Sequence, residues 1–439
     1  MSLDLLFSCR HNIRVKTCSI PVIEIAQNLG KYKALPLSEF VTELEYTPLE
    51  TSDDCLIGEW DGGFNHIIVT TSYIFVAGYR FCYAFDRNGR FLCEIGRIGQ
   101  GPGEYQYMRG LSIDENKKSL YIDAVYSILE YSYDGVFRRS IKIPQTQLKV
   151  NDRLESYSMN NVYLVRNNLF IGHTDNPMGN AKYTFQLIND SAQVVESFDN
   201  HVQFNRTKAF FSSSERAMRP YRVLENIYVK EVPNDTIYCL NVNNELISQF
   251  VFNLGQYAYN VKDREDAGVN NPSSQIPHIL QLKVIFVPYI PIPMVGTHNF
   301  IFFSYEARNL SEKYTFPKRN VSPPPVGVQN FIETDSKSHL GIYDIINQRT
   351  QLLDTDPVLR RRGLINDLDG GLPFWPKYYS SANELVDVWQ AYEMKEYLTD
   401  TYFAAQEIKN PFAYQKLKEL LKRLNEEDNP VIIIANLKK

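Results

Sequence analysis

The residues best suited to chemistry in this 439-residue chain follow a glycine-rich loop. The loop is Gly96-Arg97-Ile98-Gly99-Gln100-Gly101-Pro102-Gly103, and Glu104 and Tyr105 come directly after it. Backbone amides of such a loop can hold an anion. However, the loop lacks the Lys-Ser/Thr ending of a nucleotide-binding P-loop, and its glycine spacing is not that of dinucleotide-binding proteins. We therefore interpret it as a tight connection between two structural units.

A second polar group lies near the carboxyl end, in Asn366-Asp367-Leu368-Asp369-Gly370-Gly371. Carboxylate and carboxamide oxygens are ligands that calcium prefers, but the later bidentate Glu of an EF-hand loop is missing. A polar turn capped by its own side chains is the preferred interpretation. We expect no cofactor, with calcium at Asp367 and Asp369 as the alternative. Trp375, which follows closely, is either a stacking surface for a sugar or peptide or a buried junction residue.

Other catalytic and binding classes find little support. The chain has no Gly-x-Ser-x-Gly elbow, no sialidase-type Ser-x-Asp box with its Trp, and no HxxxH pair among seven histidines. The formal charge is −5, without a long block of one sign. Because nucleic-acid binding requires a concentrated basic face, we expect no nucleic-acid partner.

The six cysteines show no metal-binding spacing. Cys82 and Cys93 flank a hairpin, but alternation places them on opposite faces of it, so we expect two buried thiols and no disulfide. Cys9 follows Leu5-Leu6-Phe7-Ser8, which is similar to a bacterial lipobox without its basic leading region. Cys9 is therefore a candidate lipidation site.

The elements that position these residues are repeated hairpins. The first turns at Asn88-Gly89 between apolar alternating runs. Similar units are expected to begin near residues 119, 168, 236, 299 and 340. Their spacing of about 40–67 residues is typical of four-stranded blades with inserted loops, so we predict an all-β, six-bladed β-propeller. In that fold the connection at 96–105 places Glu104 and Tyr105 at the mouth of the central channel.

The carboxyl end changes its pattern. Apolar residues recur at helical spacing across 383–425, which predicts two amphipathic helices packed on the propeller. The apolar run at 430–436 predicts a strand that pairs with an early strand and closes the ring. The expected organisation is a lead-in or anchor over 1–30, a propeller over 31–380, a helical insertion over 381–428 and a closing strand over 429–439.

Several motifs resemble those of the six-bladed β-propeller lipoproteins of anaerobic Gram-negative gut bacteria. They are Gly99–Tyr105 after a Phe-Asp-x-x-Gly hairpin, Tyr46–Thr51, Asn366–Gly371, Phe374–Pro376 and Asn429–Val431. The resemblance covers roughly residues 35–439. It implies an NHL-like or TolB-like propeller, export and a lipid anchor in the outer membrane. It implies no assigned activity.

Three functional hypotheses follow. The first is a monomeric, non-catalytic envelope protein that binds a glycan, a peptide or a partner protein through Glu104, Tyr105, Asp367, Asp369 and Trp375. The second is a calcium-assisted hydrolase or lyase, which requires Glu104, Asp367 and Asp369 to converge. The third is a scaffold that docks partners on its helical pair. The distance between these carboxylates separates the second hypothesis from the others.

Overall fold

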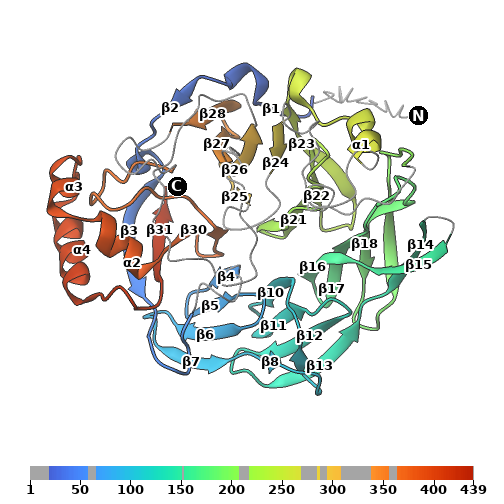
Figure 1. Cartoon of the computed structure of the whole chain (residues 1–439), viewed down its shortest axis with the longest axis horizontal. Coiled ribbons are helices and arrows are strands. Elements are labelled where there is room, and N and C mark those ends of the chain that lie inside the picture. The colour runs from blue at the N-terminus through green and yellow to red at the C-terminus, as the bar shows by residue number, and fades with distance from the viewer. Residues whose placement is uncertain are drawn as a thin grey trace, which may run out of the picture.

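The chain folds into six antiparallel sheets arranged as blades around a central axis (Figure 1). This computed structural model describes residues 19–57, 66–150, 153–206, 217–267, 284–286, 294–307, 338–354 and 363–438. The predicted six-bladed β-propeller is confirmed. Cys9 lies outside the described residues, so its lipidation stays a prediction.

The first three blades are four-stranded and follow the chain from the axis to the rim. Blade 1 contains β4 (His66–Val69), β5 (Tyr73–Ala77), β6 (Cys82–Asp86) and β7 (Phe91–Glu94). Blade 2 contains β10 (Gly110–Asp114), β11 (Ser119–Asp123), β12 (Ser127–Ser132) and β13 (Phe137–Lys142). Blade 3 contains β16 (Asn160–Arg166), β17 (Leu169–His173), β18 (Tyr183–Ile188) and β19 (Val194–Asp199).

The other three blades draw strands from distant parts of the chain. Blade 4 contains β20 (Tyr221–Val223), β21 (Asn226–Val229), β22 (Thr236–Leu240) and β23 (Leu246–Asn253). Blade 5 contains β25 (Val295–Gly296), β26 (Phe300–Ala307), β27 (Ser338–Asp344) and β28 (Arg349–Leu353), with β24 (Val284–Phe286) paired to β26. Blade 6 contains β29 (Tyr378–Tyr379), β30 (Glu384–Trp389), β31 (Val431–Leu437) and β3 (Val41–Pro48).

Blade 6 closes the ring by joining the two ends of the chain. The carboxyl-terminal strand β31 lies between β30 and the amino-terminal strand β3, antiparallel to both. Register pairs Thr47 with Ile432 and Val388 with Ile432, so the apolar β31 is enclosed on both edges. A central strand with both edges paired exposes no free backbone groups. The predicted closing strand is confirmed.

The amino-terminal segment also fastens two further blades. The short strand β1 (Val22–Glu24) runs parallel to the outer strand β23 of blade 4, and β2 (Tyr32–Lys33) runs parallel to the outer strand β28 of blade 5. Ile23 and Ile25 are fully buried against blades 4 and 5. Residues expected as a lead-in therefore form a strap that covers two blade edges before completing the third.

Asn429 locks this closure through its side chain. Its amide nitrogen donates to the carbonyls of Glu50 at 2.6 Å and Cys55 at 2.9 Å, and its amide oxygen accepts from the backbone of Ile57 at 2.8 Å. The backbone of Asn429 also donates to the Thr51 hydroxyl at 2.8 Å. The residue is buried, so these contacts satisfy three backbone groups of the loop that follows β3.

The first hairpin forms as predicted, but a β-bulge changes its faces. Gly89 adopts a φ of +85°, and a side chain there would collide with the Pro48 carbonyl. The register shifts between Ala84 and Phe85, which places Cys93 opposite Ala84 and on the same face as Cys82. The alternation argument for these cysteines is therefore wrong. Both are free thiols, Cys82 buried and Cys93 half-buried.

Two other sequence expectations differ from the structure. The units expected near residues 299 and 340 belong to one sheet, because β26 pairs directly with β27. The helical spacing assigned from residue 383 is wrong at its start, since Glu384–Trp389 is the buried strand β30. The helices of this insertion are α2 (Ala391–Tyr397), α3 (Asp400–Ala404) and α4 (Pro411–Arg423), whereas α1 (Val261–Ala267) lies elsewhere.

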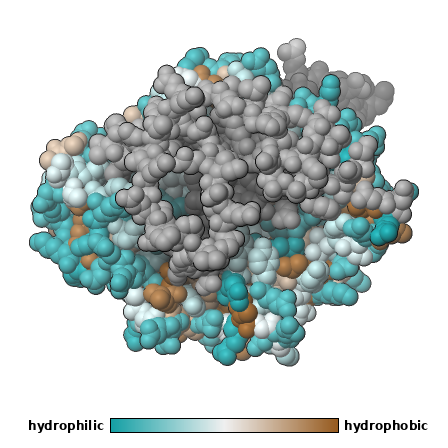
Figure 2. Space-filling model, viewed as in Figure 1, coloured by the Kyte–Doolittle hydropathy of each residue, from teal (hydrophilic) through white to brown (hydrophobic). Residues whose placement is uncertain are grey.

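The helices pack at the outer side of blade 6 (Figure 1). Leu417 and Leu420 of α4 are buried in the same core cluster as Trp375, Trp389 and Val431. The visible rim is mainly hydrophilic, with separate hydrophobic spots (Figure 2). Within the described ranges, we find no helix that combines the length and apolarity needed to cross a membrane.

We expect Asn429→Ala to lower the free energy of unfolding by roughly 2–4 kcal/mol, because three buried backbone groups would lose their partners. Chemical denaturation measures the change. Asn425→Ala, at an exposed position two residues beyond α4, is the matched control and should change stability by less than about 0.5 kcal/mol. Equal stability of both variants would contradict this role of Asn429.

Candidate ligand-binding channel

The main cavity of the described structure is the central channel. It measures about 550 Å³ and is lined by residues from the innermost strands of all six blades and from the turns beside them. Ligand sites usually measure about 300–1,000 Å³, so the channel is large enough for a small molecule. Its charged and aromatic lining comprises Asp114, Glu115, Arg166, Arg219, Arg222, Glu225, Lys377, His66, His298, Tyr163, Tyr221, Tyr378 and Tyr379.

Arg219 extends across the channel. It directly precedes β20 in blade 4, and its Nη2 lies 3.4 Å from Nε2 of His66 on β4 in blade 1. These blades are opposite each other in a ring of six. Burial lowers the pKa of Arg219 to about 10, so the guanidinium stays charged at neutral pH. Burial and the nearby Arg219 also hold the pKa of His66 well below 6.5, which keeps this imidazole neutral.

Arg222 lies on the same strand, nearer to its end. Its Nη2 donates to the carbonyls of Leu164 at 2.8 Å and Val165 at 2.7 Å on the neighbouring β16. Arg166, at the end of β16, donates to the carbonyl of Val242 at 2.8 Å and to Asn244. Burial and the nearby Arg222 lower the pKa of Arg166. Two cations therefore lie close together at the boundary between blades 3 and 4.

Three tyrosines supply phenol groups from two opposite blades. Tyr163 belongs to β16 in blade 3, and Tyr378 and Tyr379 form β29 in blade 6. Burial raises the pKa of Tyr378 well above 10, and Tyr163 and Glu115 add to the increase. Tyr379 donates to Asn383 at 2.9 Å and lies 3.1 Å from Nδ1 of His298. The phenols of Tyr163 and Tyr378 therefore remain neutral near physiological pH.

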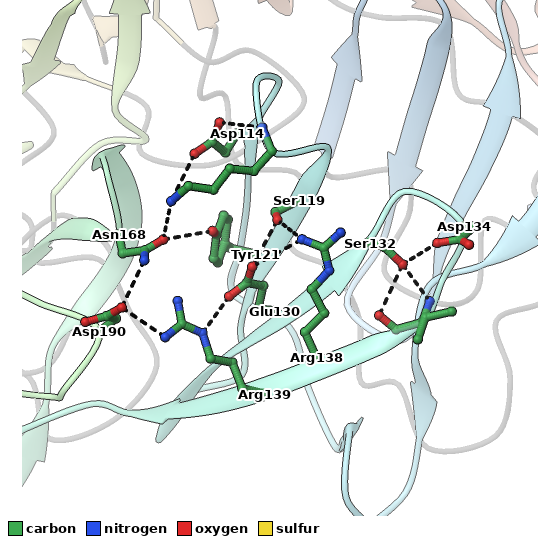
Figure 3. A network of polar contacts seen from close by, with 12 residues as sticks. Asp114, Ser119, Tyr121, Glu130, Ser132, Asp134, Arg138, Arg139, Asn168 and Asp190 are labelled. Atoms are coloured by element: carbon green, nitrogen blue, oxygen red, sulfur yellow. Dashed lines mark hydrogen bonds and ion pairs between the residues drawn. The ribbon is translucent and has the colours of Figure 1, made fainter.

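The rim of the channel between blades 2 and 3 is held by a polar network (Figure 3). Glu130 accepts from Ser119 at 2.9 Å and from Arg139 at 2.7 Å, and Arg139 also binds Asp190 at 3.0 Å. Asp190 accepts from Asn168 at 2.9 Å in the turn that follows β16. Burial alone raises the pKa of Glu130, but the hydrogen bonds from Arg139 and Ser119 outweigh it, so the net shift is downward.

Glu104 and Tyr105 do not line this cavity. They form the short strand β9 (Glu104–Tyr105), which pairs with β8 (Arg97–Ile98) beyond the outer strand of blade 1. Glu104 accepts from the backbone of Gly101 at 2.8 Å, and Tyr105 is buried in the core between blades 1 and 2. The expected position at the channel mouth is wrong, because the connection runs along the rim before the chain returns to the axis.

Asp367 and Asp369 lie together at a structural junction. Asp367 accepts from the backbone of Ser38 at 2.9 Å and from Lys409 at 2.6 Å, so it joins the strap to the helical insertion. Asp369 accepts from Tyr46 at 3.1 Å, and from Asn366 at 2.7 Å and the backbone of Gly371 at 2.9 Å. Burial raises the pKa of Asp369 despite these bonds. The segment is a capped polar turn.

Trp375 is buried at the same junction and packs edge-on against Phe302, with ring centroids 5.6 Å apart. Its backbone donates to Asp387 at 2.9 Å. Glu104 belongs to the connection between blades 1 and 2, whereas Asp367 and Asp369 belong to the junction beside blade 6, so the three carboxylates do not form one site. No cluster of three or more His, Cys, Asp or Glu side chains suited to a metal ion occurs within the described ranges.

The residues that do line the channel escape the sequence analysis for one reason. The predicted units in blades 2, 3 and 4 begin at strands β11, β17 and β22, so the innermost strands of those blades are missed. The available signal is the short polar-apolar alternation before each unit, as in Tyr221-Arg222-Val223. In blade 3 that signal is weakened by two register irregularities in β16.

We expect Asp367→Asn to lower the melting temperature at pH 7 by about 2–4 °C. Although burial raises the pKa of Asp367, hydrogen bonds from Lys409 and Ser38 lower it overall. A lowered carboxyl pKa contributes stability above the unfolded-state value near 4, and this contribution disappears as the pH falls through the folded-state pKa. The two melting curves should therefore converge in acid.

Thermal unfolding between pH 3 and 8 tests this prediction. Glu407→Gln removes the exposed carboxylate 4.0 Å from Lys409 and is the matched control, which should leave the melting temperature unchanged. A difference between wild type and Asp367→Asn that is the same at pH 3 and pH 7 would show that the carboxylate charge is not responsible.

Comparisons with known proteins agree with this fold. An exported-protein structure from Bacteroides fragilis NCTC 9343 aligns over 96% of this chain and 100% of that chain, with a TM-score of 0.63 and 16% identity. A member of the DUF4221 family from Bacteroides vulgatus aligns over 71% of this chain and 84% of that chain, with a TM-score of 0.41 and 9% identity. No curated protein matches the sequence. A family model described as "Domain of unknown function (DUF4934)" matches residues 20–436, and this chain therefore belongs to the DUF4934 family.

Proposed function

We propose that this protein is a non-catalytic binding propeller of the cell envelope and that its ligand occupies the central channel. The ligand classes are those expected from the sequence: a glycan, a peptide or an exposed segment of a partner protein. The observation that carries the proposal is the 550 Å³ cavity to which all six blades contribute. A site built from every blade uses the rigidity of the closed ring to hold its side chains in place.

The lining supports recognition rather than bond cleavage. Arg222 and Arg166 donate to backbone carbonyls of neighbouring elements, which fixes their orientation before a ligand arrives. Neutral phenols and fixed guanidinium groups are donors that bind oxygen-rich ligands. The calcium-assisted hydrolase requires Glu104 beside Asp367 and Asp369, and these residues belong to separate parts of the ring.

The proposal includes an address. We place the protein in the envelope as an exported monomer, attached to the outer membrane through a lipid on Cys9. Support comes from the lipobox-like segment Leu5–Cys9 and from the exported Bacteroides fragilis protein with the same fold. A single acyl chain binds membranes weakly, so stable attachment requires more than one chain on the modified cysteine.

Glycan and peptide arrays followed by calorimetry test binding by the full chain. We expect a ligand whose binding is abolished by Ser381→Trp, because Ser381 is exposed and borders the channel, so a large side chain there obstructs it. Ser191→Trp, in the exposed turn between β18 and β19, is the matched control and should bind normally. Normal binding by Ser381→Trp, or chemical conversion of the ligand, would overturn the proposal.

The address has its own test. Cells grown with a labelled fatty acid should incorporate the label into the wild-type protein and not into Cys9→Ala, which should leave the membrane fraction. Cys239→Ala, at a buried position in β22, serves as the control and should remain labelled. Label retained by Cys9→Ala would contradict lipidation at this residue.

A further inference from the structure

Charge is unevenly distributed along the channel. Arg219 and Lys377 directly precede the innermost strands β20 and β29, whereas Asp114 ends β10, and Glu115 and Glu225 follow the ends of β10 and β20. Every blade begins at the channel and ends at the rim, so the innermost strands run in the same direction. The channel therefore has a cationic end and an acidic end.

Not all of these charges are equally available to a ligand. Lys377 binds Asp387 at 3.0 Å and the carbonyl of Val388 at 3.0 Å, which commits it to blade 6. Asp114 lies 3.7 Å from Lys117 and also caps the backbone of that residue. Arg219 is different, because its guanidinium extends across the cavity to His66, which is held neutral. A neutral imidazole does not compensate a cation, so an anion beside Arg219 gains electrostatic stabilisation.

The middle of the channel suits a molecule with many hydroxyl groups. Tyr163 and Tyr378 approach from opposite blades, and Glu115 and Arg222 act on the same region. Carboxylates accept hydroxyl protons, guanidinium groups donate to hydroxyl oxygens, and phenols do both. Aromatic rings also offer apolar faces to the C–H surfaces of a ligand. A simple inorganic anion would use only the Arg219 end.

We propose that the channel binds an acidic sugar, with its carboxylate at Arg219 and its hydroxyl groups among Tyr163, Tyr378 and Glu115. This inference rests on the proposed channel-binding function and specifies its ligand. A pyranose ring with one carboxylate matches both the charge at one end and the mixed donors and acceptors between. The acidic groups at the other end orient the ligand, because they repel its carboxylate.

Two matched sugar pairs test the inference by calorimetry on the full chain. The pairs are D-glucuronate with D-glucose and D-galacturonate with D-galactose, which differ only in the carboxylate. We expect at least one acid to bind ten-fold or more tightly than its neutral partner. We also expect Arg219→Gln to remove this preference and Arg219→Lys to retain part of it. Arg97→Gln, an exposed position on the rim, is the control and should bind as wild type.

Tyr163→Phe keeps the experiment decisive if Arg219→Gln fails to fold. It removes one hydroxyl and should weaken both members of a bound pair without changing their ratio. Equal binding of acid and neutral sugar, or a preference that survives in Arg219→Gln, would overturn the acidic-sugar inference and leave the channel-binding function standing. Failure of all four sugars, with an array ligand still blocked by Ser381→Trp, would also overturn only the inference. Array binding that Ser381→Trp does not affect would overturn the function as well.

Discussion

The structure depends on the pairing of β31 with β3. An open array of blades would expose the backbone groups of β30 at one side of the break, and such edges promote association. The chain solves this by inserting its last strand between β30 and its first long strand, so that blade 6 contains residues from both ends. Asn429 then binds three backbone groups of the loop after β3, which makes the closure sensitive to one buried amide.

The strap extends this logic around half of the ring. Before reaching β3, the amino-terminal segment adds a parallel strand to the outer edges of blades 4 and 5, and Ile23 and Ile25 become buried. Blades 4, 5 and 6 are therefore connected by one continuous segment as well as by their mutual packing. The Asp367 junction ties the same segment to the helical insertion through Ser38 and Lys409. Carboxylates that sequence alone relates to ligands are here committed to joining three parts of the fold.

The channel acquires its properties from this rigidity. Arg219 and His66 are separated by 153 positions in the sequence and meet only because blades 1 and 4 are held opposite each other. Desolvation by the surrounding blades lowers the pKa of both groups, and it leaves one of them charged and the other neutral. An exposed pair would be screened by water and ions and would have no such difference in function. Closure of the ring is thus what gives these two side chains their value for binding.

The repeated hairpins, the strand propensity and the apolar terminal run determined the propeller, its six blades and its closing strand from sequence alone. Those features depend on local alternation and on turn residues such as Gly89, which require little knowledge of distant contacts. Tertiary structure decided the assignment of strands to blades, as when β26 and β27 joined one sheet, and it also decided the face of Cys93 through a bulge. It placed Glu104 at the rim and Asp369 in a buried turn, and it brought Arg219, Tyr163 and Tyr378 together at the axis. The physical reason is that a site at a propeller axis takes single residues from short, irregular inner strands, and only the closed ring defines which of them meet.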